Sequence, residues 1–411
     1  MPPISRFAPP LGALCLLVTA GEAAAGAFQL REGSAAALGS SLAGRTSGDR
    51  DVSFALYNPA AFRTVETFEV SAGVAGVFAV TDAEAVNTPP IPGLTTSDDA
   101  GETAAVPGFA MGWRYDEHFV FGLTVRSPFG LATKYSRDFV GGFAGVDSEL
   151  LTIAVTPTVA VEPVPGFAFG VGATIQYADA RLSNLNGSLQ EQDVAGDDIS
   201  YGFNVGVLAD VAPRTTIGAA FTWGVSHELE GSFSDNFEPG VFSGDGKAEI
   251  DLPAVFSLGV THGFTDDFRA MAEVEWIGWS AYDSILITDT DTGAQINDVQ
   301  DYDDAFMIAA GAEYDVSNAF SVRAGVAYDK TPSVDEHRSV RVPDADRYWA
   351  SAGFSYAITE NFGVDAAYTF IYFDDTSVTK LPAAIGGGAG ARIDYNDSQA
   401  HVVSLNATYR F

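Results

Sequence analysis

Three stretches of the chain alternate apolar and polar residues with a period of two. The last of them places Val403, Leu405, Ala407, Tyr409 and Phe411 on one face and Ser404, Asn406, Thr408 and Arg410 on the other. The same alternation runs through 268–276 and 362–372, with aromatic side chains on the apolar face. A strand that separates lipid from a watery lumen needs this arrangement. A soluble β-sandwich alternates as well, so the cellular location has to decide between the two.

The first 25 residues are typical of a secretory signal peptide. Arg6 supplies the positive charge, 11–20 is a short apolar core, and the small residues 23–25 form a cleavage site that leaves Gly26 first. Cleavage would also remove Cys15, the single cysteine, so we expect no disulfide in the exported chain. After the signal, no stretch approaches the roughly 20 apolar residues of a membrane helix. An exported, alternating chain without such helices favours a β-barrel of the outer membrane.

The charge balance and the absence of certain motifs argue against several functions. With 54 acidic against 21 basic residues and a net charge of −33, the chain lacks the basic surface of a nucleic-acid binder. No nucleophile motif accompanies any of the five histidines, His118, His227, His262, His337 and His401. The acidic run 289–293 opens like a calcium loop but has no glutamate at the closing position. We therefore expect no enzyme, no cofactor and no metal site.

The spacing of turns predicts the number of strands. Short turns rich in Asp, Asn, Pro or Gly occur near Asp116 and Pro213 and at 163–166, 263–267, 315–318 and 359–361. Long polar stretches occur at 81–102, 130–147, 183–197, 230–246, 288–300, 329–346 and 378–397. These connections predict fourteen antiparallel strands with short periplasmic turns and long external loops. The terminal Phe411 resembles the signal by which the barrel-insertion machinery recognises its substrates.

The strands begin near Thr67, which leaves 26–66 outside the wall. This segment is rich in Gly and Ala and holds Phe28, Leu38 and Phe54, so it suits short packed helical turns better than a tilted strand. A barrel of this size has a lumen that is either water-filled or blocked. We therefore predict a signal peptide at 1–25, a plugging hatch at 26–66 and a barrel at 67–411. A flexible periplasmic tail is the alternative for the hatch, but disordered segments usually lack such apolar residues.

Several motifs, in order along the chain, carry a family resemblance. They are Ala27-Phe28-Gln29-Leu30, Asn58-Pro59-Ala60, Ser127-Pro128-Phe129-Gly130-Leu131-Ala132-Thr133-Lys134-Tyr135, Leu252-Pro253-Ala254, Trp276-Ile277-Gly278-Trp279-Ser280 and Val342-Pro343-Asp344-Ala345-Asp346-Arg347-Tyr348-Trp349. Together they resemble the FadL-type outer-membrane transporters (OmpP1/FadL/TodX family) of long-chain fatty acids and other hydrophobic compounds. The resemblance implies a fourteen-stranded barrel plugged by an N-terminal hatch.

The resemblance also implies roles for individual residues. Phe28 matches the aromatic residue that reaches the high-affinity pocket, and Asn58-Pro59-Ala60 matches the hatch segment that approaches an opening in the wall. That opening is an inward kink of the third strand, for which Pro128-Phe129-Gly130 has suitable chemistry, and it releases substrate sideways into the membrane. Two ordinary readings stay open. Pro128 and Gly130 could simply end the strand at its loop, and Asn58-Pro59 could be a plain turn initiator.

One departure from the family concerns substrate charge. Family members that carry fatty acids have basic side chains in the deep pocket, at positions that correspond here to Asn184 and about Asp298. Neither residue can pair with a carboxylate, and Arg181, three residues before Asn184, is the one nearby substitute. A buried anionic head group without a counter-charge is costly. This departure favours neutral hydrophobic substrates.

The sequence thus predicts an outer-membrane protein that takes up fatty acids or neutral hydrocarbons and lipids by passive diffusion, with lateral release. We expect it to be a monomer that contacts outer-membrane lipid and lipopolysaccharide. The alternative is a general porin or a surface adhesin. The hatch and the apolar residues of the external loops favour the transporter.

Overall fold

The computed structural model describes residues 27–234, 237, 242, 244–387 and 390–411. The predicted signal peptide at 1–25 therefore lies outside the described residues. No helix in the described part of the chain is long and apolar enough to cross a membrane.

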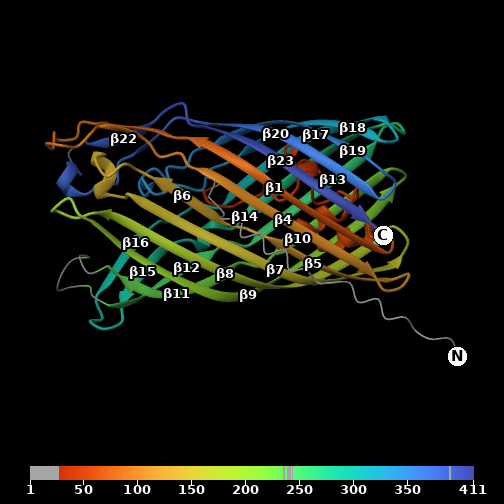
Figure 1. The fold of residues 1–411 in the computed structure, drawn as a ribbon, viewed down its shortest axis with the longest axis horizontal. Coiled ribbons are helices and arrows are strands. Elements are labelled where there is room, and N and C mark those ends of the chain that lie inside the picture. The colour runs from red at the N-terminus through yellow and green to blue at the C-terminus, as the bar shows by residue number, and fades with distance from the viewer. Residues whose placement is uncertain (1–26, 235–236, 238–241, 243, 388–389) are drawn as a thin grey trace.

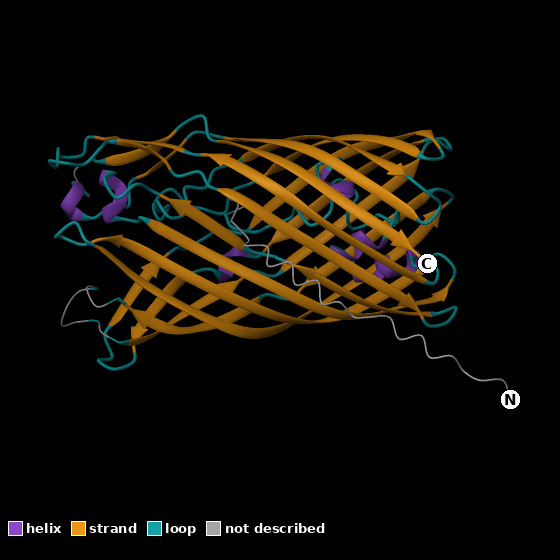
Figure 2. Ribbon diagram, viewed as in Figure 1, coloured by secondary structure: helices purple, strands orange, loops and turns teal. Residues whose placement is uncertain are grey.

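The described chain forms one closed antiparallel sheet (Figures 1 and 2). Nineteen hydrogen-bonded elements make up the wall, and because five of them continue the element before them, they form the predicted fourteen strands. In chain order these are β1 (Phe68–Val80), β4 (Thr103–Arg114), β5 (Phe119–Arg126) with β6 (Gly130–Lys134), β7 (Asp147–Val164), β8 (Phe167–Leu185), β9 (Glu191–Ala212), β10 (Thr215–Thr222) with β11 (Val225–Phe233), β12 (Asp245–Leu252) with β13 (Val255–Gly263), β14 (Phe268–Ile277) with β15 (Ser284–Asp289), β16 (Gln295–Val299) with β17 (Ala305–Ser317), β18 (Phe320–Asp329), β19 (Arg347–Ala357), β20 (Phe362–Phe373) and β23 (Gln399–Arg410). The first strand closes the barrel by pairing with both β4 and the last strand, β23.

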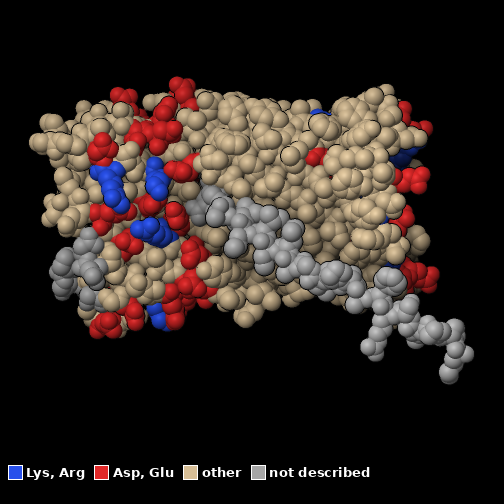
Figure 3. All heavy atoms as spheres, in the orientation of Figure 1, with Lys and Arg blue, Asp and Glu red and all other residues tan. Residues whose placement is uncertain are grey.

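The alternation sets which side of each strand faces outward. Along β14, Phe268, Val274 and Trp276 are exposed, whereas Glu273 and Glu275 between them are buried. Charged side chains gather toward the two ends of the barrel and leave a band of other residues between them on the face seen in Figure 3. An uncharged band between polar ends is the surface that a membrane-spanning barrel presents to lipid.

Short turns join the strands at the end of the barrel where the chain terminates (Figure 1). They lie where the sequence predicted them, for example between β7 and β8 and between β13 and β14. Two predicted long loops, 183–197 and 288–300, were wrong, and in the second of them β16 pairs with β15. Instead of a long loop at 183–197, β8 and β9 stay paired out to Leu185 and Glu191, and only 186–190 turns. The polar residues here form a hairpin that projects beyond the apolar band, where both of its faces can be polar.

The long connections carry structure of their own at the opposite end. A small sheet joins β2 (Asp82–Val86), β3 (Ser97–Asp99), β21 (Thr376–Val378) and β22 (Arg392–Tyr395). Three short 3-10 helices accompany the loops: η3 (Val140–Phe143), η4 (Trp279–Ala281) and η5 (Ala383–Ile385). Buried residues such as Tyr135, Phe139 and Tyr395 pack the sheet against η3 and η5. The outer loops therefore have an apolar core that is separate from the one in the barrel.

Residues 27–66 lie inside the barrel, mostly toward the short-turn end (Figure 2). They form α1 (Ala35–Leu38), η1 (Val52–Leu56) and η2 (Pro59–Thr64), and Ser34, Asp51 and Asn58 cap these helical turns with their side chains. A capping side chain accepts a backbone N–H that the helix leaves unpaired, which explains why short turns can form here. The apolar residues of this segment are almost fully buried against the wall. We refer to 27–66 as the hatch.

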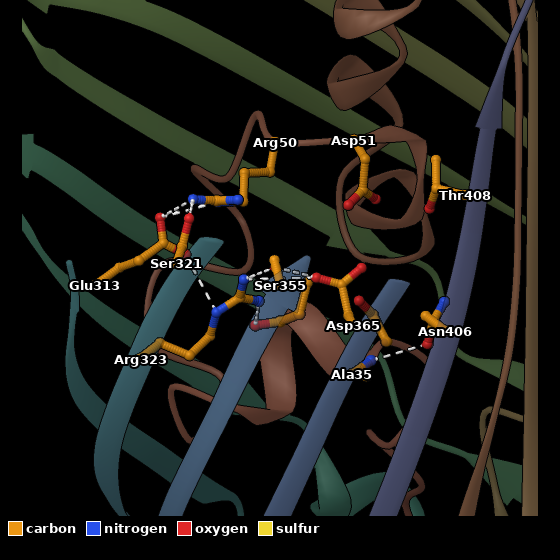
Figure 4. Close-up of polar contacts among 12 residues, drawn as sticks. Ala35, Arg50, Asp51, Glu313, Ser321, Arg323, Ser355, Asp365, Asn406 and Thr408 are labelled. Carbon is orange, nitrogen blue, oxygen red and sulfur yellow. Dashed lines mark hydrogen bonds and ion pairs between the residues drawn. The ribbon is translucent and has the colours of Figure 1, made fainter. Parts of the chain in front are cut away.

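Buried polar contacts fasten the hatch to the wall (Figure 4). Arg50 of the hatch pairs with Glu313 of β17 at 2.7 Å. Arg323 of β18 pairs with the same carboxylate at 3.2 Å and donates a hydrogen bond to the carbonyl of Ala36 at 2.7 Å. The amide of Ala35 donates to Asn406 of β23 at 3.0 Å. These contacts join α1 and the start of η1 to three strands of the wall.

Candidate functional site

The third strand of the wall is interrupted. Its first part, β5, pairs with both β4 and β7, but its second part, β6, pairs with β7 alone among the described residues. The pairing with β7 also shifts by one residue, from Arg126↔Ala154 to Gly130↔Leu151. The three residues between them include Pro128, which has no N–H to give to a ladder. Pro128, Phe129 and Gly130 therefore interrupt a strand within the wall.

The start of the hatch fills this break. Gln29 forms an isolated antiparallel bridge with Phe129. The amide of Leu30 donates to the carbonyl of Pro128 at 2.9 Å, and the amide of Gly130 donates to the carbonyl of Phe28 at 2.8 Å. Backbone groups inside a membrane need internal partners. Residues 28–30 supply them, so this segment acts as a short extra strand in the gap.

The side chain of Phe28 enters a cage of aromatic rings. Its ring centroid lies 4.7 Å from that of Trp279, 5.2 Å from Tyr282 and 6.2 Å from Phe129, each in an edge-to-face arrangement. Tyr302 completes the cage, 5.1 Å from Tyr282. Such ring pairs are favourable beyond the area they bury. We call Phe129, Trp279, Tyr282 and Tyr302 the aromatic box, with Phe28 as its occupant.

The aromatic box is apolar but not without hydrogen-bonding groups. The indole Nε1 of Trp279 is buried and has no hydrogen-bond partner among the described residues. Burial raises the pKa of Tyr282 and of Tyr302, so both phenols are neutral donors at neutral pH. The box can therefore surround a hydrophobic group and offer N–H or O–H groups to a polar atom.

A cavity lies between the hatch and the wall beside the break. Its lining includes hatch residues Gln29, Leu30, Arg31, Arg45 and Tyr57, residues Arg126, Pro128 and Phe129 at the break, and residues of the wall between β7 and β14. The cavity holds about 50 Å³. Because one water needs about 10–15 Å³ on this measure, a few waters fit but a lipid chain does not. The hatch and the wall therefore leave no room for such a chain in this cavity.

Two arginines of the hatch that line this cavity form ion pairs with carboxylates of the wall. Arg31 contacts Glu275 at 2.8 Å and Asp329 at 3.1 Å, and Arg45 pairs with Glu273 and Glu275. Burial lowers the pKa of Arg45 to about 10, which still leaves it charged at neutral pH. These ion pairs anchor the hatch close to the segment that fills the break.

The residues predicted to receive the substrate lie in different places. Phe28 and Phe129 meet in the aromatic box. Asp298 lies near Tyr282, and its carboxylate is occupied by Lys380 at 2.7 Å and by the amide of Gln300 at 2.9 Å. Asp298 thus already has a cation as its neighbour.

Asn184 and Arg181 do not reach the aromatic box. The side-chain amide of Asn184 donates to the carbonyl of Leu185 at 3.2 Å, in the hairpin beyond the membrane band. Arg181 shares its face of β8 with the exposed Ile175 and Asp179, opposite to the buried Ala178 and Ala180, and pairs with Asp193 at 3.4 Å. Alternation along β8 explains this placement, because the odd-numbered residues from Phe167 to Arg181 lie on the outward face. Arg181 therefore does not replace a pocket cation.

The Asn58-Pro59-Ala60 segment also lies elsewhere than expected. Asn58 accepts the amide of Ala60 at 3.0 Å, and its side chain donates to Thr46 at 2.7 Å and to Val207 of β9 at 3.1 Å. A Cβ at Gly206 would overlap the Asn58 side chain, so glycine permits this close approach. Strand β9 is three strands around the wall from the break. Asn58 is thus a cap and an anchor of the hatch, and it does not line the break.

Sequence reasoning missed four residues of this site. Trp279 was part of a motif without a role. Tyr282 and Tyr302 lie in two short breaks, between β14 and β15 and between β16 and β17, whose paths the sequence does not reveal. Arg126 was missed although its position carries a signal. It shares the lumen face of β5 with the buried Val120 and Thr124, directly before Ser127-Pro128.

A family model described as "Outer membrane protein transport protein (OMPP1/FadL/TodX)" matches residues 16–411. A 47 kDa outer membrane protein of Pasteurella multocida is 29% identical over 439 residues, which cover 99% of each chain. The long-chain fatty acid transport protein of Escherichia coli K12 is 22% identical over 416 residues, which cover 90% of this chain and 93% of the relative.

Solved structures agree on the fold. A FadL homologue of Pseudomonas aeruginosa superimposes with a TM-score of 0.84 at 24% identity, over 93% of this chain and 99% of the other. The Pseudomonas putida toluene transporter TodX gives 0.70 at 15% identity, over 94% and 100%. These findings confirm the predicted fold, the outer-membrane location and a non-enzymatic transport function for hydrophobic compounds. Since the family model matches nearly the whole length, this chain belongs to the OMPP1/FadL/TodX family of outer-membrane transport proteins.

Proposed function

We propose that this protein takes up hydrophobic compounds by binding them in the aromatic box and releasing them sideways into the membrane through the break in the third strand. One observation carries the proposal. Phe28 occupies the box with its side chain and closes the break with its carbonyl, which accepts the amide of Gly130 at 2.8 Å. A ligand that displaces the ring also pulls on the segment that fills the break. Binding and opening are then the same movement.

Residue chemistry supports a broad range of hydrophobic substrates. The box offers ring faces and edges together with the Nε1 of Trp279. Relatives are named for long-chain fatty acid and toluene transport, and this chain is similar to both. We infer that fatty acids or neutral hydrocarbons pass by this route. The small closed cavity and the buried hatch oppose the alternative of a general porin.

The test compares two tryptophans three residues apart. Trp279 is fully buried in the box, whereas Trp276 is 41% exposed on the outer face of β14. Uptake of a labelled alkane and a labelled fatty acid is measured in Gram-negative cells that lack their own transporter. Trp279→Ala should lower uptake of both compounds about tenfold, because a buried aromatic anchor typically contributes more than 1 kcal/mol to binding. Trp276→Ala should leave uptake within about twofold of wild type. Equal uptake by both variants would show that the substrate does not pass through the aromatic box.

The remaining expectations extend this proposal. A signal peptide at 1–25, membrane insertion directed by Phe411, a monomeric state and contact with lipopolysaccharide all fit a barrel of this family. N-terminal sequencing of the exported protein tests the first of them, because cleavage as predicted leaves Gly26 at the start.

A further inference from the structure

Arg126 points into the cavity beside the break. It is the last residue of β5 and lies on the lumen face with Val120 and Thr124. The cavity is lined by Arg126 together with Arg31, Arg45 and Glu275. Arg126 is thus a cation placed where the break meets the interior of the barrel.

Arg126 differs from the two other arginines in having no acidic partner. Arg31 and Arg45 both pair with Glu275, and each has a second carboxylate, Asp329 or Glu273. Among the described residues, no ion pair and no hydrogen bond joins the guanidinium of Arg126 to another group. The chain has 54 acidic and 21 basic residues, so a lumenal arginine without a carboxylate is unexpected. An enclosed charge without a partner is costly, which calls for a guest that supplies the opposite charge.

Other groups around the cavity are also incomplete. The Oε1 atom of Gln29 and the Oδ1 atom of Asn204 are buried and have no hydrogen-bond partner among the described residues. Both residues line the same cavity as Arg126. Buried polar atoms of folded proteins nearly always have partners. Both atoms are acceptors, which the few waters that fit in the cavity can satisfy, so the guanidinium of Arg126 is the group that calls for an anion.

Apolar side chains line the cavity beside Arg126, and Ala154 is its direct partner on β7. Leu30, Phe129 and Ala154 line the cavity next to Pro128, and Phe129 is shared with the aromatic box. Once the hatch has moved, a guest can place a polar head at Arg126 while its chain stays among apolar side chains. This combination fits an amphiphile better than a pure hydrocarbon.

We propose that Arg126 binds the carboxylate of an amphiphilic acid as it passes from the aromatic box to the break in the third strand. The inference rests on the proposed pathway and adds its substrate class. A guanidinium holds a carboxylate through two parallel hydrogen bonds, which gives strong and directional binding. A phosphate fits less well, because the cavity is small and Glu275 would repel a doubly charged group.

This inference revises the preference for neutral substrates. That preference came from Asn184 and Asp298, which stand at the positions where relatives that carry fatty acids have basic residues. The structure provides a lumenal cation at a different place. It is Arg126, the last residue of β5, which directly precedes the break. The carboxylate receives its counter-charge near the exit instead of deep among the external loops.

The test uses a matched pair of probes, hexadecanoic acid and hexadecane, in the same uptake assay at neutral pH. Arg126→Gln should lower uptake of the acid about tenfold or more and leave uptake of the alkane within twofold, because a hydrogen bond to a charged group is lost. Arg126→Lys should retain part of the acid uptake. Arg214→Gln, which changes an exposed arginine paired with Asp266 at a short turn, serves as the control. The heat-modifiable migration of each variant on gels reports whether the barrel is folded.

Binding to the purified barrel gives a second measurement that does not depend on release. The Kd for octanoate should rise about tenfold in Arg126→Gln, while the Kd for 1-octanol should stay unchanged. An equal loss for both probes, or no loss for either, overturns the carboxylate role. If Trp279→Ala lowers alkane uptake while Arg126→Gln changes nothing, only this inference fails. If Trp279→Ala changes nothing, the proposed pathway itself fails.

Discussion

The amide of Gly130 donates to the carbonyl of Phe28 at 2.8 Å, which joins the wall of the barrel to the hatch by a strand-like hydrogen bond. The residue on the hatch side also places its ring 4.7 Å from Trp279. A single residue therefore connects the closed state of the wall to the occupancy of the aromatic box. The predictions below test this connection and the anchors that hold the hatch in place.

Enlarging Gly130 should loosen the hatch segment. A Cβ at this position would lie 2.8 Å from Cδ1 of Leu30, so a side chain here has to push that residue aside. We expect Gly130→Val to raise the hydrogen exchange of the amides of residues 28–30 without unfolding the barrel. Gly363→Ala is the control, because the nearest atom to its Cβ would lie at 3.8 Å, an ordinary contact. Unchanged exchange in Gly130→Val would mean that Leu30 is not held against the break.

Removing the Asn58 side chain should weaken the hatch but not the barrel. Asn58→Ala deletes a helix cap and two donated hydrogen bonds in a buried place, which should cost the hatch about 2 kcal/mol. Protease cleavage within 27–66 of the folded barrel measures this loss. Asn361→Ala, at an exposed turn, should have no effect on it. Equal resistance in Asn58→Ala and wild type would contradict the anchoring role.

Truncating Arg323 should destabilise the protein more than truncating an exposed arginine. Arg323→Ala leaves the buried Glu313 and Asp365 with fewer partners and the carbonyl of Ala36 without its donor. Breaking a buried charge network from one side typically costs about 3–5 kcal/mol. The midpoint of denaturant unfolding should fall accordingly, whereas Arg214→Ala should shift it by less than about 1 kcal/mol. A similar small shift for both variants would show that the network in Figure 4 is not a main anchor.

Docking of the hatch should depend on pH through Glu32. Burial raises the pKa of this carboxyl above its ordinary value of 4.5. The folded state then favours the protonated acid, so its stabilising effect is complete below pH 4.5 and is lost as the pH rises through the raised pKa. Glu32→Gln should make the hatch more resistant to protease than wild type at pH 8 and equal to it at pH 4. A difference of the same size at both pH values would exclude Glu32 as the cause.

The fold could be predicted because each strand carries its own signal. Alternation along 268–276 identifies the lipid face of β14 residue by residue, and local turn residues such as those at 163–166 mark the strand ends. The hairpin at 183–197 was misread because polarity marks exposure to water and does not by itself mark a loop. Once a strand leaves the membrane, both of its faces can be polar.

The site could be predicted only in part. Phe28 and Phe129 came from motifs, but the box around them needs Trp279, Tyr282 and Tyr302. These come from two breaks in the wall strands, whose paths are set by tertiary packing. The position of Asn58 against β9 depends on how the hatch is folded inside the barrel. Whether an arginine such as Arg126 has an ion-pair partner depends on groups far away in the chain. The sequence therefore predicts that its side chain faces the lumen but not that it lacks an acidic partner.

The central claim is that the hatch segment leaves the break when substrate passes. Gln29 and Phe129 form an antiparallel bridge, and opposed residues in such a pair lie within the range that a disulfide can span. The double variant Gln29→Cys/Phe129→Cys fixes the segment in the break when oxidised and frees it when reduced. The exported chain is predicted to contain no other cysteine, because Cys15 lies in the signal peptide. The reduced form of the double variant therefore serves as the control for the oxidised form, because both carry the same two substitutions.

The deciding measurement is uptake of a labelled alkane by cells carrying this double variant, before and after treatment with dithiothreitol, with the extent of crosslinking read on gels. The two single-cysteine variants should show no change on reduction. We predict that uptake by the fully crosslinked protein is at least tenfold below that of the reduced protein and recovers when the disulfide is cleaved. Equal uptake in the crosslinked and reduced states would show that substrate crosses the barrel without opening this break, and would contradict the account.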